Sequence, residues 1–206
     1  MSRLFRAKKL YFSLGVALWL FATAWGAKVL YVYSFTPGTN GQPAEVWPAG
    51  AGFSRADGIC TLVVALHPEC PCSRATVSEL ATLLEQTTPR LRAIVVFLDT
   101  APDRPAGESE LFKTVRQLPG VTVVRDHDGS ELERFRFLTS GETRLYRPDG
   151  TLAFRGGITP SRGHTGDSPG RAAVIAAVRS PTGSPPLASI RTPAFGCALA
   201  SAPTVR

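Results

Sequence analysis

Two cysteines separated by one proline, Cys70-Pro71-Cys72, stand where a short apolar run gives way to a helical pattern. The run before them, residues 61–66, has the length and β-branched content of a buried strand. After them, in residues 76–85, apolar side chains recur at helical spacing. Thiols at a helix N-terminus become more acidic, because unpaired backbone N–H groups and the helix dipole favour the thiolate. Thiolates attack disulfides and bind soft metals, so the motif predicts a redox or metal centre.

The C-x-C spacing restricts the redox chemistry of this pair. A disulfide between Cys70 and Cys72 closes a small ring with little freedom to reach the preferred torsion of about 90°, and Pro71 stiffens the ring further. Strain favours the dithiol, so such a pair acts as an oxidant or isomerase more readily than as a strong reductant. In an alternative scheme one of them is the nucleophile, and a distant cysteine, Cys197 or Cys60, resolves the mixed disulfide. A Cys60–Cys197 disulfide, a structural role for Cys60 and incidental cysteines are further alternatives.

A glycine-rich loop, residues 156–167, carries further polar candidates. If it folds over the cysteines, Arg162 stabilises a thiolate and His164 shuttles protons. The alternative role for the end of the loop is to cap the helix that follows, through Asp167 or Ser168.

A soft-metal site is the alternative to redox chemistry. His67, Cys70, Cys72 and His164 supply the thiolate and imidazole ligands that suit Cu(I) or Zn. Two thiolates at positions i and i+2 can share one metal without forming the strained disulfide. Copper or zinc is therefore the alternative cofactor, and the redox scheme requires none.

The N-terminal residues have the composition of a single-pass membrane anchor. Residues 10–35 contain one charge, Lys28, and are long enough to span a hydrocarbon core of about 30 Å. The formal net charge is +7, and its densest cluster lies in residues 1–9, which indicates a cytoplasmic end and not a nucleic-acid interface. A cleaved signal peptide is the alternative, because Ala22-Thr23-Ala24 has a small-x-small pattern. The anchor is favoured because apolar residues and interfacial aromatics continue to Tyr33, and either arrangement places the domain where disulfides form.

Composition divides the rest of the chain into three parts. Residues 36–57, rich in Pro and Gly, predict a tether, residues 58–180 a folded domain, and residues 181–206 a polar tail. The domain alternates predicted strands at 60–66, 91–98, 120–125, 142–147 and 152–156 with predicted helices at 73–86, 108–117, 130–138 and 170–179. The last two strands form a hairpin around a Pro-Asp-Gly turn. This order predicts an α/β fold with a mixed sheet flanked by helices.

Residues 58–180 resemble the thioredoxin-like superfamily, and in particular its membrane-tethered bacterial branch, which includes the cytochrome-maturation thiol reductases. The resemblance lies in the element order, the cysteine position and the hairpin at 146–152, where an Asp-Gly turn is followed by an apolar residue. Two features depart from the family: C-P-C replaces C-x-x-C, and the cis-proline before the hairpin is missing from residues 139–143. Gly141 is the candidate for that place, since glycine allows close backbone approach. The resemblance therefore implies the fold more firmly than the activity.

Together these features predict a membrane-anchored thiol–disulfide exchange protein that acts outside the cytoplasm through Cys70 and Cys72. We expect an inner-membrane protein whose domain faces the periplasm or cell exterior, with exported or membrane protein thiols as partners. Cys70, expected to be the more exposed, attacks first, and Cys72 is a thiolate held by helix N–H groups and Arg74, although the order of the two stays open. One alternative is a copper-binding or copper-delivery domain, since the sequence resembles thioredoxin-fold copper chaperones with two cysteines and a later histidine. Another is a non-catalytic adaptor in membrane complex assembly.

Overall fold

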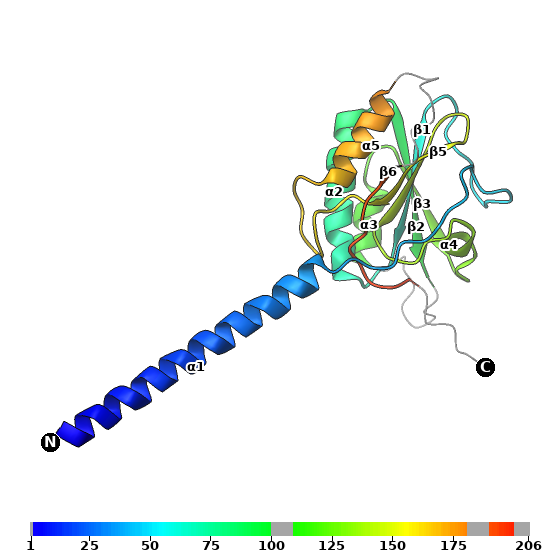
Figure 1. Cartoon of the computed structure of the whole chain (residues 1–206). Helices are drawn as coiled ribbons and strands as arrows, with labels where there is room; N and C mark the ends of the chain where they lie inside the picture. Colours follow the sequence, from blue (N-terminus) through cyan, green and yellow to red (C-terminus); the bar gives the residue numbers. More distant parts are fainter. Residues whose placement is uncertain (1, 100–108, 181–189, 200–206) are drawn as a thin grey trace. The chain divides into compact units, whose positions relative to one another are not determined.

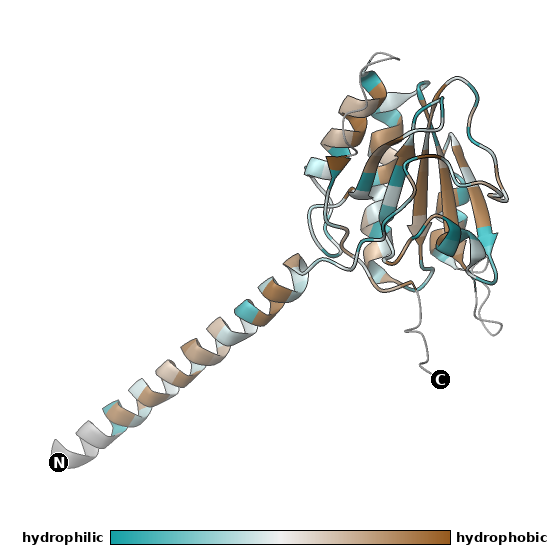
Figure 2. Cartoon of the chain, turned by 45° about the vertical axis from the view of Figure 1, so that its right-hand side comes forward, coloured by the Kyte–Doolittle hydropathy of each residue, from teal (hydrophilic) through white to brown (hydrophobic). Residues whose placement is uncertain are grey.

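The computed structural model describes residues 2–99, 109–180 and 190–199, which form two compact units on either side of Thr36. The first unit is helix α1, Ser2–Phe35. Within α1, residues Lys8–Phe35 are long and apolar enough to cross a membrane, and none of this stretch is buried. Its 28 residues span about 42 Å at 1.5 Å per residue, which exceeds a hydrocarbon core of about 30 Å. Figure 2 shows apolar residues on the successive turns of this helix.

The second unit is built on a mixed sheet with the strand order β3-β2-β1-β4-β5-β6 (Figure 1). Strand β1 is parallel to β2, and β2 is parallel to β3, whereas β4 runs antiparallel to both β1 and β5. The strands are β1 Cys60–Leu66, β2 Leu91–Leu98, β3 Val121–Asp126, β4 Glu142–Tyr146, β5 Leu152–Gly157 and β6 Ile190–Arg191. The mixed sheet is as predicted, except that β6 was not expected in a polar tail.

Helices cover both faces of the sheet (Figure 1). They are α2 Pro71–Thr87, α3 Glu110–Arg116, α4 Ser130–Arg134 and α5 Pro169–Arg179. Alternate residues of the buried strand β1 point to opposite faces. Leu62 and Leu66 join the core formed with α2, α3 and α5, whereas Val63 and Ala65 join the core that contains Leu132 of α4. The predicted helices all occur within a few residues of their expected limits, and residue 108 lies outside the described part.

Residues 38–53 pack against the folded domain, although the sequence analysis assigned them to a tether. The Trp47 ring contacts Phe53, Phe135 and Tyr146 with ring centroids 5.0–5.8 Å apart. The backbone N–H of Trp47 donates to the Gly150 carbonyl at 2.8 Å, and this hydrogen bond joins the segment to the β4–β5 hairpin. The prediction of a tether is wrong for this stretch, because the partly buried Trp47 packs against the core cluster that contains Leu132 of α4.

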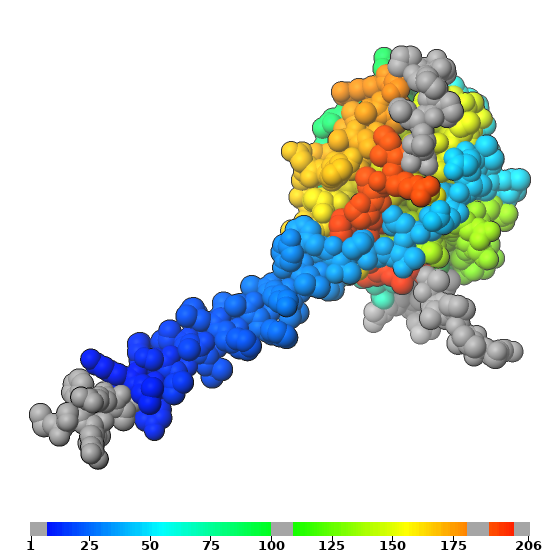
Figure 3. Space-filling model, viewed as in Figure 1, coloured from blue at the N-terminus to red at the C-terminus, as the bar shows by residue number. Residues whose placement is uncertain are grey.

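The described part of the predicted tail, residues 190–199, also belongs to the domain. Strand β6 pairs with β5, and Thr192 donates its backbone N–H to the Arg155 carbonyl. The side chain of Asn40 bridges the Thr192 carbonyl and the Ala194 N–H, so the N-terminal and C-terminal segments of this unit lie side by side (Figure 3). A segment that composition marked as irregular therefore carries Cys197 to a fixed place.

Candidate functional site

Cys70 lies at the junction where β1 passes into α2. It is the N-cap residue of α2, and Pro71 occupies the first helical turn, where a missing N–H costs no hydrogen bond. The connection is closed by hydrogen bonds to the His67 carbonyl, from the Cys70 N–H at 3.3 Å and from the Ser73 hydroxyl at 3.0 Å. The Cys70 sulfur also makes contacts outside α2.

Cys197 supplies the nearest of these contacts. Its Sγ atom lies 2.8 Å from the Cys70 Sγ atom, and neither cysteine forms a disulfide. The backbone fixes this placement, because the Ser140 N–H donates to the Cys197 carbonyl at 2.8 Å and the Leu199 N–H donates to the Leu138 carbonyl at 2.9 Å. Of the two remote cysteines considered from the sequence, the structure brings Cys197 to the Cys-Pro-Cys motif.

The two facing thiols have pKa values shifted in opposite directions. Burial raises the pKa of Cys70, but hydrogen bonds from the side chain and backbone of Cys197, from the Cys72 backbone and from the Ser73 side chain outweigh it, and the net pKa is below 9.0. Burial, followed by the hydrogen bond and charge of Cys70, raises the pKa of Cys197 to about 12. Of the two thiols, Cys70 therefore loses its proton more readily, and Cys197 keeps its proton more firmly.

The low pKa of Cys70 predicts a pH profile for its alkylation. Because the thiolate is the reactive form, iodoacetamide should modify Cys70 with a midpoint below pH 9.0, the ordinary value for the thiol. In Cys197→Ala the midpoint should rise, since the side-chain hydrogen bond that stabilises the Cys70 thiolate is gone. Peptide mass spectrometry across a pH series measures this midpoint at Cys70 alone. An unchanged midpoint in the variant would show that Cys197 does not stabilise the thiolate.

Cys72 is a neutral thiol that faces Arg162. Burial, followed by the charge of Cys70 and a hydrogen bond with it, raises the pKa of Cys72, and the guanidinium of Arg162 opposes this shift. Arg162 also donates to the Gly196 carbonyl at 2.6 Å, so it connects the glycine-rich loop to the C-terminal segment. The exposed Arg74 does not fill the role expected for it, because Arg162 is the cation that acts on Cys72.

Both cysteines of the motif are covered. Cys70 is 4% exposed and Cys72 is 5% exposed, so the expectation that Cys70 is the more accessible is wrong. The assignment of Cys72 as the thiolate is also wrong, because the raised pKa belongs to Cys72 and the lowered pKa to Cys70.

Gly141 lies directly before β4 in a position that requires glycine. Its φ angle is +92°, and its N–H donates to the Ala65 carbonyl at 2.7 Å. A Cβ at this position would lie 2.9 Å from the Thr76 hydroxyl oxygen on α2. The strand-to-helix connection and the loop before β4 therefore approach each other at a distance that only glycine permits.

The two histidines of the predicted metal set make local contacts. The Glu69 N–H donates to His67 Nδ1 at 3.1 Å, and the exposed His164 has its Nδ1 atom 2.7 Å from the Arg162 carbonyl. Within residues 2–99, 109–180 and 190–199, no three His, Cys, Asp or Glu side chains are grouped to hold a metal. The set His67, Cys70, Cys72 and His164 is thus not assembled in this structure. The predicted cap of the next helix is formed, since the Ser168 side chain accepts from the Arg171 N–H at 3.1 Å.

Cys60 lies at the opposite end of β1 from the motif. The strand runs from Cys60 to Leu66, which corresponds to about 20 Å at 3.3 Å per residue. Burial raises the pKa of its thiol. This placement excludes a Cys60–Cys197 disulfide and a resolving role for Cys60. It is consistent with the structural role considered for Cys60.

Comparison with known proteins finds solved structures of low sequence identity. No family model and no curated protein matches the chain. An uncharacterized conserved protein from Geobacillus kaustophilus has a similar structure, with a TM-score of 0.58 and 15% identity over 82% of this chain and 94% of that one. A hypothetical protein from Sinorhizobium meliloti gives a TM-score of 0.55 and 19% identity over 81% and 94% of the two chains. A secreted disulfide oxidoreductase of Mycobacterium tuberculosis, homologous to E. coli DsbE, gives a TM-score of 0.42. Its sequence identity is 16%, and the match covers 59% of this chain and 81% of that one.

The order of the strands decides the fold class. Parallel strands β3, β2 and β1 continue into an antiparallel hairpin, and the helix after β1 begins at a cysteine pair. The domain has the thioredoxin-like fold. In this thioredoxin-like domain, the Cys-Pro-Cys motif stands at the N-terminus of α2, and Gly141 lies directly before the hairpin.

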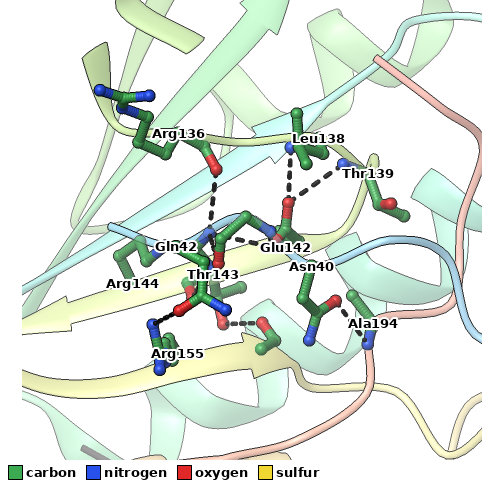
Figure 4. A network of polar contacts seen from close by, with 12 residues as sticks. Asn40, Gln42, Arg136, Leu138, Thr139, Glu142, Thr143, Arg144, Arg155 and Ala194 are labelled. Atoms are coloured by element: carbon green, nitrogen blue, oxygen red, sulfur yellow. Dashed lines mark hydrogen bonds and ion pairs between the residues drawn. The ribbon is translucent and has the colours of Figure 1, made fainter. Parts of the chain in front are cut away.

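A buried ion pair in β4 supports the loop that holds Cys197 (Figure 4). Glu142 and Arg144 are both fully buried, and Arg144 Nη2 lies 2.8 Å from Glu142 Oε1. The other carboxylate oxygen of Glu142 accepts the N–H groups of Leu138 and Thr139 at 2.6 and 3.0 Å. The Leu138 carbonyl also accepts the Leu199 N–H. The Glu142 carboxylate therefore fixes the backbone of residues 138–139, which pairs with the C-terminal segment.

Arg144 extends the same network toward the neighbouring loop. Its guanidinium donates to the Arg136 carbonyl at 3.3 Å and the Thr143 carbonyl at 3.1 Å, and lies 4.7 Å from the centre of the Phe137 ring. Sequence reasoning missed both charged residues. The available signal was their i, i+2 spacing inside a predicted strand, which places two opposite charges on one face of the sheet.

Glu79 holds the glycine-rich loop that presents Arg162. It is 2% exposed and forms an ion pair with Arg171, and its Oε1 atom accepts the Gly166 N–H at 2.7 Å. Glu79 is seven residues after Cys72, so both lie on one face of α2. This buried carboxylate was also missed, although its charge within an apolar helical stripe was a visible signal.

Proposed function

We propose that this protein is a membrane-anchored thiol–disulfide exchange protein that acts outside the cytoplasm. Cys70 is the nucleophile and Cys197 is the resolving thiol. The observation that carries the proposal is the separation of 2.8 Å between an acidified Cys70 sulfur and the Cys197 sulfur. Helix α1 supports the anchor, and the basic residues before its apolar part favour a cytoplasmic N-terminus.

Exchange at this pair proceeds in two displacement steps. The Cys70 thiolate attacks one sulfur of a partner disulfide, a Cys70–partner disulfide forms, and the other partner sulfur leaves as a thiolate that takes up a proton. Cys197 then loses its proton and attacks Cys70 Sγ, which forms the Cys70–Cys197 disulfide and releases the second partner thiol. The protein dithiol is oxidised and the partner disulfide is reduced, and the reverse sequence donates the disulfide to a partner dithiol.

The charge on Cys70 controls when Cys197 becomes reactive. The hydrogen bond and charge of Cys70 contribute to the raised pKa of Cys197, of about 12. In the mixed disulfide Cys70 carries no charge, so the pKa of Cys197 falls and its thiolate forms more readily. Cys197 therefore stays protonated while Cys70 waits for a partner and gains reactivity once the mixed disulfide exists.

Disulfide mapping of the full chain in detergent tests this assignment. Mild oxidation, proteolysis and mass spectrometry should recover a peptide pair that joins Cys70 to Cys197. With a partner disulfide present, Cys197→Ala should accumulate a mixed disulfide at Cys70, because the second step is blocked. Recovery of a Cys70–Cys72 disulfide in its place would transfer the resolving role to Cys72. If oxidation produced no disulfide at Cys70, the exchange function itself would be rejected.

A further inference from the structure

The C-terminal segment, residues 195–199, occupies the approach to the Cys70 sulfur. Cys70 is 4% exposed while Cys197 faces it, so an external disulfide reaches Cys70 only after this segment moves. The segment pairs with residues 138–140 through the Thr139–Ala198 bridge and the two flanking backbone hydrogen bonds. Another chain can make the same backbone hydrogen bonds to residues 138–140.

Two positions of the segment set side-chain requirements. At Gly196, immediately before the cysteine, a Cβ would overlap the Ser140 carbonyl oxygen and crowd the Thr139 side chain. At Leu199, two residues after the cysteine, the side chain is 6% exposed and packs in the core cluster that contains Phe137. A segment that fits this surface therefore needs glycine before its cysteine and an apolar residue two positions after it.

We propose that residues 138–140 and the Cys70 sulfur form the docking site for an exchange partner whose cysteine lies in an extended Gly-Cys-x-apolar segment. The chain's own residues 195–199 have this pattern and occupy the site until a partner displaces them. After the Cys70–partner disulfide has formed, they return to the site and Cys197 resolves that disulfide. This inference rests on the proposed exchange function and adds the class of substrate to it. Arg162 contributes to the site as well, since it donates to the carbonyl of the residue before the cysteine.

Peptide probes test the pattern on the reduced full chain in detergent. The reference probe has the sequence of residues 193–199, with its cysteine joined by a disulfide to an aromatic thiol that absorbs light when released. Attack by Cys70 on the peptide sulfur forms a protein–peptide disulfide and expels the aromatic thiolate, so absorbance reports the rate. Probes with alanine in place of glycine, or serine in place of the final leucine, should react at least about 10-fold more slowly. Reaction of all probes with free glutathione corrects for their intrinsic reactivity.

A small aromatic disulfide without a peptide tests the exchange function separately from the docking site. If it reacts at Cys70 while the three peptides react at equal corrected rates, the docking site is rejected and the exchange function stands. If neither the small disulfide nor any peptide reacts at Cys70, the exchange function is rejected as well.

A substitution in the chain gives an independent test of competition by the C-terminal segment. Gly196→Ala places a methyl group against the Ser140 carbonyl, which displaces the segment, so Cys70 should be alkylated about 10-fold faster than in the unaltered protein. Gly15→Ala is the control, because Gly15 belongs to helix α1 and a Cβ there meets no atom within 4 Å. Equal alkylation rates in Gly196→Ala and the unaltered protein would show that the segment does not cover the site.

Discussion

Replacing Cys70 with alanine should reduce the rate of thiol–disulfide exchange by about 100-fold or more, because the variant lacks the attacking thiolate. Cys72→Ala should lose much less, about 10-fold at most, since Cys72 is a neutral thiol whose contribution is its contact with Cys70. The measurement follows release of an aromatic thiolate from a small disulfide by the reduced full chain in detergent. The contrast between the two variants distinguishes a single nucleophile from a Cys-Pro-Cys dithiol that acts as a unit.

Cys60→Ala is the matched control for this experiment. Cys60 is also a buried thiol, but burial raises its pKa and it lies at the far end of β1. The exchange rate of Cys60→Ala should equal that of the unaltered protein. Equal losses in Cys70→Ala and Cys72→Ala would contradict the assignment of Cys70 as the single nucleophile, and a full exchange rate in both would show that a cysteine outside the Cys-Pro-Cys motif performs the exchange.

The fold was predictable because its signals are local. The run at 61–66 and the helical spacing at 76–85 each reflect one element packing against one face, and such patterns survive in a single sequence. The Cys-Pro-Cys motif was placed correctly for the same reason, since a proline at the first helical turn and the end of an apolar run both mark the junction between β1 and α2.

The partner of Cys70 was not predictable in the same way. Cys197 is 127 residues away in sequence and lies in a segment whose polar composition indicates no regular structure. Its position depends on backbone pairing with residues 138–140, and that pairing depends on tertiary contacts that no local pattern records. The packing of residues 38–53 was not predictable for a related reason, because a single aromatic residue, Trp47, fixes this Pro- and Gly-rich segment to the domain.

The buried ion pair in β4 gives the second large expected effect. Glu142→Ala leaves Arg144 buried without its carboxylate and removes the acceptor of the Leu138 and Thr139 N–H groups. Loss of one partner from a buried pair costs about 3–5 kcal/mol, so the free energy of unfolding should fall by that amount. Urea unfolding of the full chain in detergent, followed by tryptophan fluorescence, measures the change, since Trp47 packs in the folded domain.

The control for this loss is Glu110→Ala, because the Glu110–Lys113 ion pair is exposed and 2.7 Å long. An exposed ion pair contributes little to stability, so Glu110→Ala should unfold almost as the unaltered protein does. The double variant Glu142→Leu, Arg144→Met should lose less stability than Glu142→Ala, because it buries no unpaired charge.

Under native conditions Glu142→Ala should also increase alkylation of Cys70, since the loop that holds residues 195–199 depends on this carboxylate. A normal free energy of unfolding in Glu142→Ala would show that the pair does not stabilise the fold, and a normal alkylation rate would show that it does not keep the site covered.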